Sequence, residues 1–264
     1  MTSVARAAVT EVFGSVRDAH GRAASRAVRK GEGDFVTSVD LAAERRLRRE
    51  LLRAFPDHGF VGEESAAVGV DRPFVWICDP IDGTSNYANG LPTYAVAAAC
   101  LHRGRPIVAA MACAPEGEVF TAAHGLGAFC GRRRLRIPRL RVDDAAIVGL
   151  QWHRGPRDLA YLPDLLATGT RIRNLGCTVA QYCAVAAGRL TANVQEQGKV
   201  WDFVAAALVV LEAGGRVTDW QGRAIFPLRS IEAERHYPTL VAGPQPHRQL
   251  LPALREHALV VPSS

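Results

Sequence analysis

Apolar residues near the start of the chain recur at intervals of three and four, which is the spacing of a helix with one buried face. Residues 4–16 carry six such positions and predict a first helix. Residues 40–55 predict a second, with leucines on one side, arginines on the other, and Thr37 or Ser38 as the N-terminal cap. Pro56 should end this helix, because proline cannot continue it.

Short apolar runs separated by glycine and proline follow the two helices and predict the strands of a sheet. These runs are residues 74–78, 94–101, 106–112, 119–122 and 127–130. The pattern then becomes mixed, with helices expected at 178–187, 202–213 and 247–257 and strands near 146–150, 216–219 and 239–242. We therefore expect an α+β fold of layered helices and sheets, rather than a doubly wound one, with a break between residues 1–140 and 141–264.

The composition is that of a globular chain with a large core. The 264 residues are 48% apolar, which suits one large domain or two closely packed halves. No basic and apolar leader and no apolar run long enough to cross a bilayer is evident, so we expect no membrane partner and a cytoplasmic location. The six cysteines are scattered, which predicts buried thiols rather than disulfides or a zinc site.

The net charge of +6 raises the question of a nucleic-acid partner, and the sequence GRRRLRIPRLR at residues 131–141 is the candidate contact. Its arginines alternate with Leu135, Ile137 and Leu140, a pattern that favours the solvent face of strands. We therefore expect no nucleic-acid partner. The positive field would still attract a small anionic substrate.

The sequence CDPIDGTSN at residues 78–86 places two carboxylates close together after a buried strand. Pro80 should hold the chain so that Asp79 and Asp82 converge, and carboxylates that share a small volume need a proton or a cation between them. Hard oxygen ligands of this kind suit Mg²⁺. Gly83 and the residues after it would offer backbone N–H groups to an anion at a helix start. The alternative is an ordinary Asp-Gly turn.

Other acids could belong to the same site, although each could also have an ordinary structural role. Glu63 and Glu64 follow a short extended segment and could form an exposed turn. Asp202 stands where an apolar helix begins and could be an N-terminal cap. Asp40 could be an acid in the first turn of its helix.

Together these segments resemble the inositol monophosphatase family of Mg²⁺-dependent, Li⁺-sensitive phosphomonoesterases. The resemblance runs from about residue 5 to about residue 245 and rests on motifs that are independent of one another. The motifs are DFVTSVD (34–40), GEES (62–65), DPIDGTSNY (79–87), WD (201–202) and EAGG (212–215).

The resemblance implies a layered α-β-α-β-α sandwich, a homodimer, and two to three Mg²⁺ ions per site. Carried over to this sequence, one ion would be held by Glu63, Asp79 and the carbonyl oxygen of Ile81, and another by Asp79, Asp82 and Asp202. A weaker third ion would depend on Glu63. The residues from 1 to 140 would supply most ligands, and those from 141 to 264 would supply Asp202 and the substrate pocket.

The resemblance also assigns catalytic and phosphate-binding roles. Thr84, oriented by Asp40, and Glu63 would position the attacking water. Asp82, Gly83, Thr84 and Ser85 would surround the phosphate of the substrate. No covalent nucleophile is then required.

Substrate choice depends on a second set of residues. Relatives contact the alcohol through a Gly-Ser or Gly-Thr segment, which aligns with Gly176, Cys177 and Thr178, and through a glutamate, which aligns with Glu196. Because the spacing from this glutamate to Asp202 is one residue shorter than in inositol-specific relatives, a flanking glutamine could face the pocket instead.

Inositol monophosphate is therefore the first expected substrate. Histidinol phosphate, a sugar mono- or bisphosphate and a nucleotide monophosphate are the alternatives within the family. A non-catalytic protein that binds phosphorylated metabolites is the alternative of another class, which the presence of every carried-over acid and of Thr84 disfavours.

Overall fold

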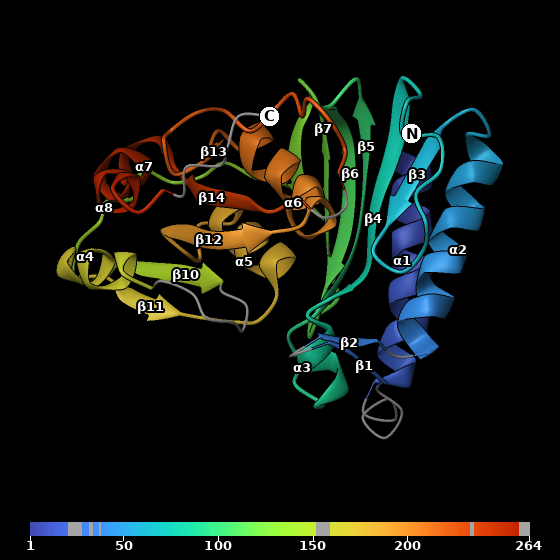
Figure 1. Cartoon of the computed structure of the whole chain (residues 1–264), viewed down its shortest axis with the longest axis horizontal. Coiled ribbons are helices and arrows are strands. Elements are labelled where there is room, and N and C mark those ends of the chain that lie inside the picture. The colour runs from blue at the N-terminus through green and yellow to red at the C-terminus, as the bar shows by residue number, and fades with distance from the viewer. Residues whose placement is uncertain (21–27, 32–33, 37, 152–158, 233–234, 259–264) are drawn as a thin grey trace.

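The computed structural model describes residues 1–20, 28–31, 34–36, 38–151, 159–232 and 235–258. Its helices and sheets form five layers, as Figure 1 shows. Helices α1 (Thr2–Ala19) and α2 (Ser38–Ala54) form the outer layer, next to a large sheet. Helices α5 (Thr178–Ala186) and α6 (Val200–Glu212) separate that sheet from a smaller one, and α4 (Tyr161–Ala167), α7 (Pro244–Leu250) and α8 (Pro252–Arg255) lie beyond it. The predicted layered α+β sandwich is confirmed.

The larger sheet has the order β3-β4-β5-β6-β7-β8-β9 in the part of the chain that the structure describes. Its first pair of strands is parallel and its other pairs are antiparallel, so hairpins connect most of it. The strands are β3 (Gly59–Gly62), β4 (Phe74–Asp82), β5 (Ala95–His102), β6 (Arg105–Cys113), β7 (Glu118–Ala123), β8 (Gly127–Cys130) and β9 (Arg133–Arg134).

The smaller sheet has the order β11-β10-β12-β14-β13 and mixes parallel with antiparallel pairs. The strands are β10 (Ile147–Gln151), β11 (Arg171–Arg173), β12 (Ala192–Gly198), β13 (Arg216–Thr218) and β14 (Tyr237–Ala242). A two-stranded ribbon, β1 (Val28–Gly31) with β2 (Asp34–Val36), and the short helix α3 (Thr84–Ala88) lie together at one end of the molecule.

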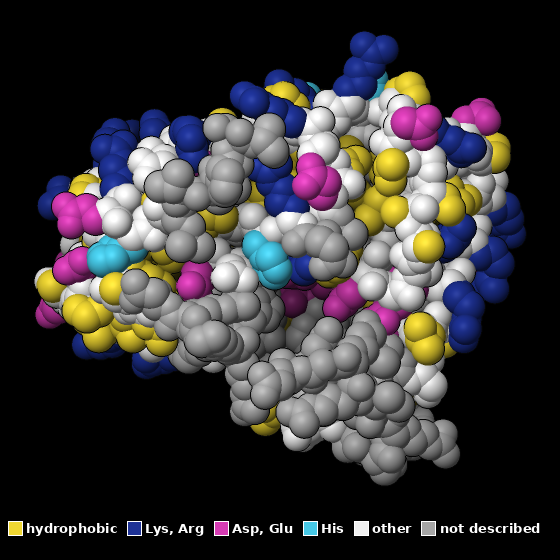
Figure 2. Space-filling model, viewed as in Figure 1, with side chains coloured by type: hydrophobic (Ala, Val, Ile, Leu, Met, Phe, Trp, Pro, Cys, Tyr) yellow, Lys and Arg dark blue, Asp and Glu magenta, His cyan; other side chains and the backbone are white. Residues whose placement is uncertain are grey.

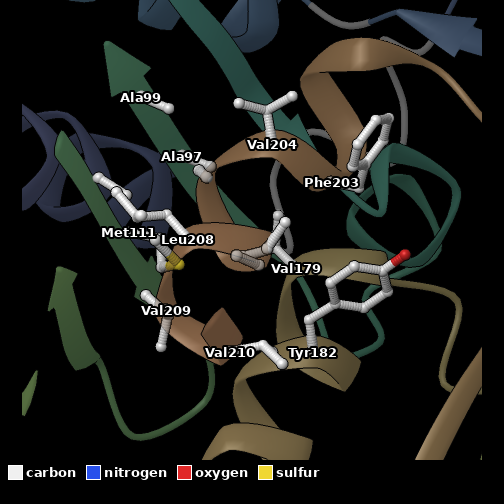
Figure 3. Close-up of a cluster of buried hydrophobic side chains, with 14 of the residues drawn as sticks. Ala97, Ala99, Met111, Val179, Tyr182, Phe203, Val204, Leu208, Val209 and Val210 are labelled. Atoms are coloured by element: carbon white, nitrogen blue, oxygen red, sulfur yellow. The ribbon is translucent and has the colours of Figure 1, made fainter. Parts of the chain in front are cut away.

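The central core surrounds α6, a helix that is apolar on almost every side. Ten of its thirteen residues are buried, which is the pattern of a helix enclosed between two layers. Figure 3 shows Leu208 beside Met111 of the larger sheet, and Val210 close to Tyr182 of α5. The small side chains of β5 let α6 approach the sheet closely, and the start of α6 is thereby fixed next to the end of β4.

Several predicted elements differ from the structure in their limits. The strand predicted to end at Cys78 continues to Asp82. The helix predicted at 247–257 is two helices, because Pro252 has no N–H group to continue the first one. Helix α4 and strands β11 and β12 were not predicted. The proposed cap at Thr37 lies outside the described residues.

The arginine-rich segment is confirmed as solvent-facing, but only Arg133 and Arg134 form a strand. Leu135 is 1% exposed and packs into the core, whereas the arginines on both sides of it are exposed. The rest of the segment is irregular, since β9 is an edge strand and Pro138 cannot donate to a ladder.

The prediction of free thiols is also confirmed. All six cysteines are unpaired, five of them are buried, and Cys130 is half-buried. No helix within the described ranges has the length and apolar character needed to cross a membrane.

Candidate active site

A bulge in β4 brings two aspartates to the same region. Asp79 lies opposite Ala97 of β5 and Asp82 lies opposite Ala95, so β4 contains one residue more than its partner between these positions. Residues three apart in a regular strand point to opposite faces, and the extra residue changes that alternation. Pro80, which lacks an N–H group, stands inside the bulge.

Asp79 is the most enclosed acid of the site. It is 1% exposed, and its Oδ1 atom is buried without a hydrogen-bond partner. Burial raises its pKa well above the ordinary value, and the charges of Glu63, Asp82, Asp202 and Asp40 raise it further. Five acids from four separate segments of the chain therefore lie close enough together for their charges to interact.

Asp82 connects this cluster to the other half of the chain. Its Oδ2 atom accepts hydrogen bonds from the backbone N–H of Val179 at 2.5 Å and from the Cys177 thiol at 3.0 Å. Burial raises the pKa of Asp82 to about 6, although these hydrogen bonds oppose the shift. Asp82 thus fixes the start of α5 against the end of β4.

Thr84 follows the end of β4 and contacts both β4 and α2. Its hydroxyl group is 2.8 Å from the carbonyl oxygen of Ile81 and 3.3 Å from Oδ1 of Asp40, which is fully buried on α2. A hydroxyl group has one proton, so it donates to one of these oxygens at a time. The adjacent Ser85 is exposed.

Gly83 needs the freedom of glycine. Its φ angle is 86°, and an added Cβ atom would come within 3.0 Å of the carbonyl oxygens of Thr93 and Gly176. The helix that follows has only five residues, so its dipole is weaker than the sequence suggested.

Asn86 was not assigned a role from the sequence, although it lies inside the DPIDGTSNY motif. Its Nδ2 group donates to the carbonyl oxygens of Thr93 at 2.8 Å and Leu175 at 2.7 Å. A Cβ atom on Gly176 would lie 2.8 Å from the same amide. Asn86 therefore ties the turn after β4 to the segment before α5, from the other half of the chain.

Asp202 is not the N-terminal cap of α6, which begins at Val200 with Lys199 as its cap. It is instead the third residue of the helix, and its Oδ2 atom accepts the N–H of Lys199 at 2.8 Å, as in a capping box. Burial raises the pKa of Asp79 and of Tyr182, and the charge of Asp202 raises both further. Glu63 follows β3 and is half-buried.

The predicted alcohol-binding residues divide into two groups. Gly176, Cys177 and Thr178 lie at the start of α5 beside Asp82, and the Nε2 group of Gln195 donates to Oγ1 of Thr178 at 3.2 Å. Glu196 is 6% exposed. Burial raises the pKa of Tyr161 on α4, and the charge of Glu196 raises it further. Gln195 therefore contacts the segment that the sequence associated with the alcohol.

The chemistry of these residues fits a divalent cation. The charges that raise the pKa of Asp79 are all carboxylates, its Oδ1 atom is unpartnered, and oxygen ligands are those that Mg²⁺ prefers. Figure 2 shows acidic side chains gathered at a hollow in the middle of one face. Within the described part of the chain, no three such side chains are already arranged to hold a metal ion. Asp82 and Asp202 each direct one carboxylate oxygen to a backbone N–H group.

The crowding of these acids predicts how the metal-free protein responds to pH. The folded-state pKa of Asp82, about 6, exceeds its ordinary value of 3.8, so the folded protein holds a proton that the unfolded chain releases. Stability should therefore fall as the pH rises between about 4 and 7, and Asp79 contributes in the same direction. Thermal melts in chelator should show a smaller fall for Asp82→Asn than for the wild type. An equal fall in stability in the two proteins would show that the raised pKa of Asp82 is not the cause.

Comparisons with known proteins agree with this geometry. A sequence profile of the inositol monophosphatase family matches residues 1–258. An inositol-1-monophosphatase of Rhizobium meliloti is 35% identical over 199 residues, which cover 73% of this chain and 75% of that protein. A Xylella fastidiosa protein named Nus factor SuhB is 35% identical over 200 residues, 74% of this chain and 72% of the other. The crystal structure of extragenic suppressor protein suhB from Bartonella henselae superposes with a TM-score of 0.87 at 30% identity, covering 96% of this chain and 98% of that one.

The layered fold and the related proteins define the class of this protein, which is a phosphomonoesterase. The chain belongs to the inositol monophosphatase family.

Proposed function

We propose that the protein is a Mg²⁺-dependent phosphatase that hydrolyses a small phosphomonoester, with inositol monophosphate as the first candidate. The observation that carries the proposal is the buried, unpartnered Oδ1 atom of Asp79 amid the charges of four other acids. An unneutralised cluster of this kind is costly, and a bound cation removes the cost. The family to which the chain belongs supports the same conclusion.

The proposed metal ligands are the carboxylates of Glu63, Asp79, Asp82 and Asp202 and the carbonyl oxygen of Ile81. That carbonyl lies close to the Thr84 hydroxyl and has a second lone pair available. Mg²⁺, when bound, lowers the pKa of water and neutralises charge on the phosphoryl and leaving oxygens. Two ions, with a weaker third at Glu63, are the number that the family resemblance favours.

The remaining steps belong to the side chains of this protein. Thr84 and Glu63 would orient the attacking water, and the position of Asp40 beside the Thr84 hydroxyl supports this role. The N–H groups of Gly83 and Thr84 would donate to phosphate oxygens, with Ser85 at the exposed edge of the turn. Catalysis would then depend on positioning and charge neutralisation, without a covalent intermediate.

The alcohol part of the substrate would meet Gly176, Cys177 and Thr178, with Glu196 or a neighbouring glutamine. The hydrogen bond from Gln195 to Thr178 favours a neutral amide at this position. Histidinol phosphate, sugar mono- or bisphosphates and nucleotide monophosphates are the alternative substrates. In this proposal, residues 1–140 supply most metal ligands, and residues 141–264 supply Asp202 and the alcohol pocket.

A homodimer and a cytoplasmic location complete the proposal. The family resemblance supports the dimer, and the six free cysteines suit a reducing compartment.

The test is phosphate release from a panel of these phosphomonoesters, measured with Mg²⁺ and with chelator. We expect turnover of at least one substrate with Mg²⁺ and none in chelator. Binding of the same compounds without release would instead support a non-catalytic protein. Full turnover in chelator would exclude the metal-dependent reaction.

A further inference from the structure

Glu44 is a buried acid that lies outside the proposed ligand set. It lies on α2, one turn after Asp40, and is 2% exposed. It forms no ion pair with the described residues, and the neighbouring Arg48 lies over the Phe60 ring instead. A buried carboxylate without a cation is costly unless it accepts strong hydrogen bonds. The burial of Glu44 therefore needs a compensating interaction.

The hydrogen bond of Glu44 supplies that compensation. Its Oε2 atom accepts the backbone N–H of Glu64 at 2.7 Å, the short distance of a bond to a charged acceptor. Glu64 directly follows Glu63, which is a proposed metal ligand. The bond therefore fixes the backbone of the segment that carries that ligand.

Gly62 provides a second and independent observation. A Cβ atom at this position would lie 2.3 Å from Oε2 of Glu44, 2.4 Å from its Cδ atom and 2.8 Å from Oε1. The backbone of Gly62 does not have a positive φ angle, so its conformation does not require glycine. The absence of a side chain at Gly62 is what lets the Glu44 carboxylate reach the Glu64 N–H.

Glu44 acts beside the acidic cluster and not within it. The charges that raise the pKa of Asp79 are those of the four acids already described. The charge of Glu44 instead adds to the effect of burial in raising the pKa of the Cys78 thiol. Helix α2 thus contacts two parts of the site, through Asp40 to Thr84 and through Glu44 to Glu64.

We propose that Glu44 and Gly62 form a positioning pair that holds the Glu63–Glu64 segment in place for metal binding. This inference rests on the proposed function of the site. Residues that orient metal ligands typically contribute 10- to 100-fold, in order of magnitude, to metal affinity or activity.

The test measures the Mg²⁺ concentration that half-stabilises each protein in thermal melts, without substrate. Glu44→Ala should raise this concentration about tenfold or more, and Glu44→Gln should change it by less than about threefold because its amide oxygen can accept the same N–H. Glu50→Ala is the matched control, since Glu50 lies on the same helix and pairs only with exposed arginines. It should bind Mg²⁺ as the wild type does.

Gly62→Ala separates positioning from general destabilisation. The new methyl group should displace the Glu44 carboxylate, so the single variant should lose Mg²⁺ affinity about as much as Glu44→Ala does. In the Glu44→Ala background, adding Gly62→Ala should raise the half-stabilising Mg²⁺ concentration by less than about a further twofold, because the carboxylate that the methyl group would displace is absent. If Glu44→Ala does not fold, Glu44→Asp, which withdraws the carboxylate from both neighbours, replaces it in the same comparison.

The outcomes distinguish this inference from the proposed function. Wild-type protein that Mg²⁺ does not stabilise would overturn both. Wild type and Glu44→Ala with the same Mg²⁺ dependence would overturn the positioning role alone. If Gly62→Ala lowers the Mg²⁺ affinity equally in the wild-type and Glu44→Ala proteins, the positioning role would also be overturned.

Discussion

Replacing Asp79 with asparagine is expected to reduce phosphate release at least about a thousandfold, which corresponds to about 4 kcal/mol of barrier. Asparagine keeps the shape of aspartate and tolerates the same turn geometry, so the substitution changes mainly the charge. Asp79 is the acid on which the other four converge, and its loss removes the ligand shared by the two proposed ions. The measurement is the rate of phosphate release with saturating Mg²⁺.

The same variant should remain folded. In chelator it should melt at the wild-type temperature or above, because the buried carboxylate is repelled by its neighbours when no cation is present. Asp71→Asn is the control, since Asp71 is exposed and its charge is not among those that raise the pKa of Asp79. Wild-type turnover by Asp79→Asn would show that the sequence CDPIDGTSN forms a turn and not a metal site.

Replacing Thr84 with valine is expected to reduce turnover about a hundredfold, within the range for a positioned proton-transfer group. Valine has the same shape but cannot donate to Ile81 or contact Asp40 through a hydroxyl group. Thr84→Ser keeps the hydroxyl and should retain activity within about threefold. The measurement is kcat at saturating substrate and Mg²⁺.

The affinity for Mg²⁺ separates this role from that of Asp79. Thr84 is not a proposed ligand, so Thr84→Val should bind Mg²⁺ nearly as the wild type does. Equal turnover by the valine and serine variants would remove Thr84 from the reaction.

Much of this fold could be predicted because its patterns are local. The first helix shows a regular apolar face, and the strands from Phe74 to Cys130 are apolar runs between glycines and prolines. Strand β12 was missed because its sequence, ANVQEQG, is largely polar although it lies in the middle of a sheet. The buried amide of Gln195 forms hydrogen bonds with Thr178 and Tyr182 of α5, and no local sequence pattern indicates these partners.

The candidate site also combines features that could be predicted from the sequence with features that could not. The proximity of Asp79 and Asp82 could be argued from their spacing around Pro80, whereas the addition of Asp40, Glu63 and Asp202 to the same site came from the family resemblance. The roles of Asn86 and Glu44 could not be predicted, because each depends on a contact between segments far apart in the chain. The need for glycine at position 62 could not be predicted either, because it comes from the approach of the Glu44 carboxylate and not from the backbone angles of Gly62.

The central claim is that the converging acids bind Mg²⁺, and titration calorimetry of the metal-free protein with Mg²⁺, without substrate, tests it most directly. Wild-type protein should bind the ion, and Asp79→Asn should bind it much more weakly while Asp71→Asn binds it unchanged. Wild-type protein that binds no Mg²⁺, or an Asp79→Asn variant that binds it as tightly as the wild type, would contradict the claim.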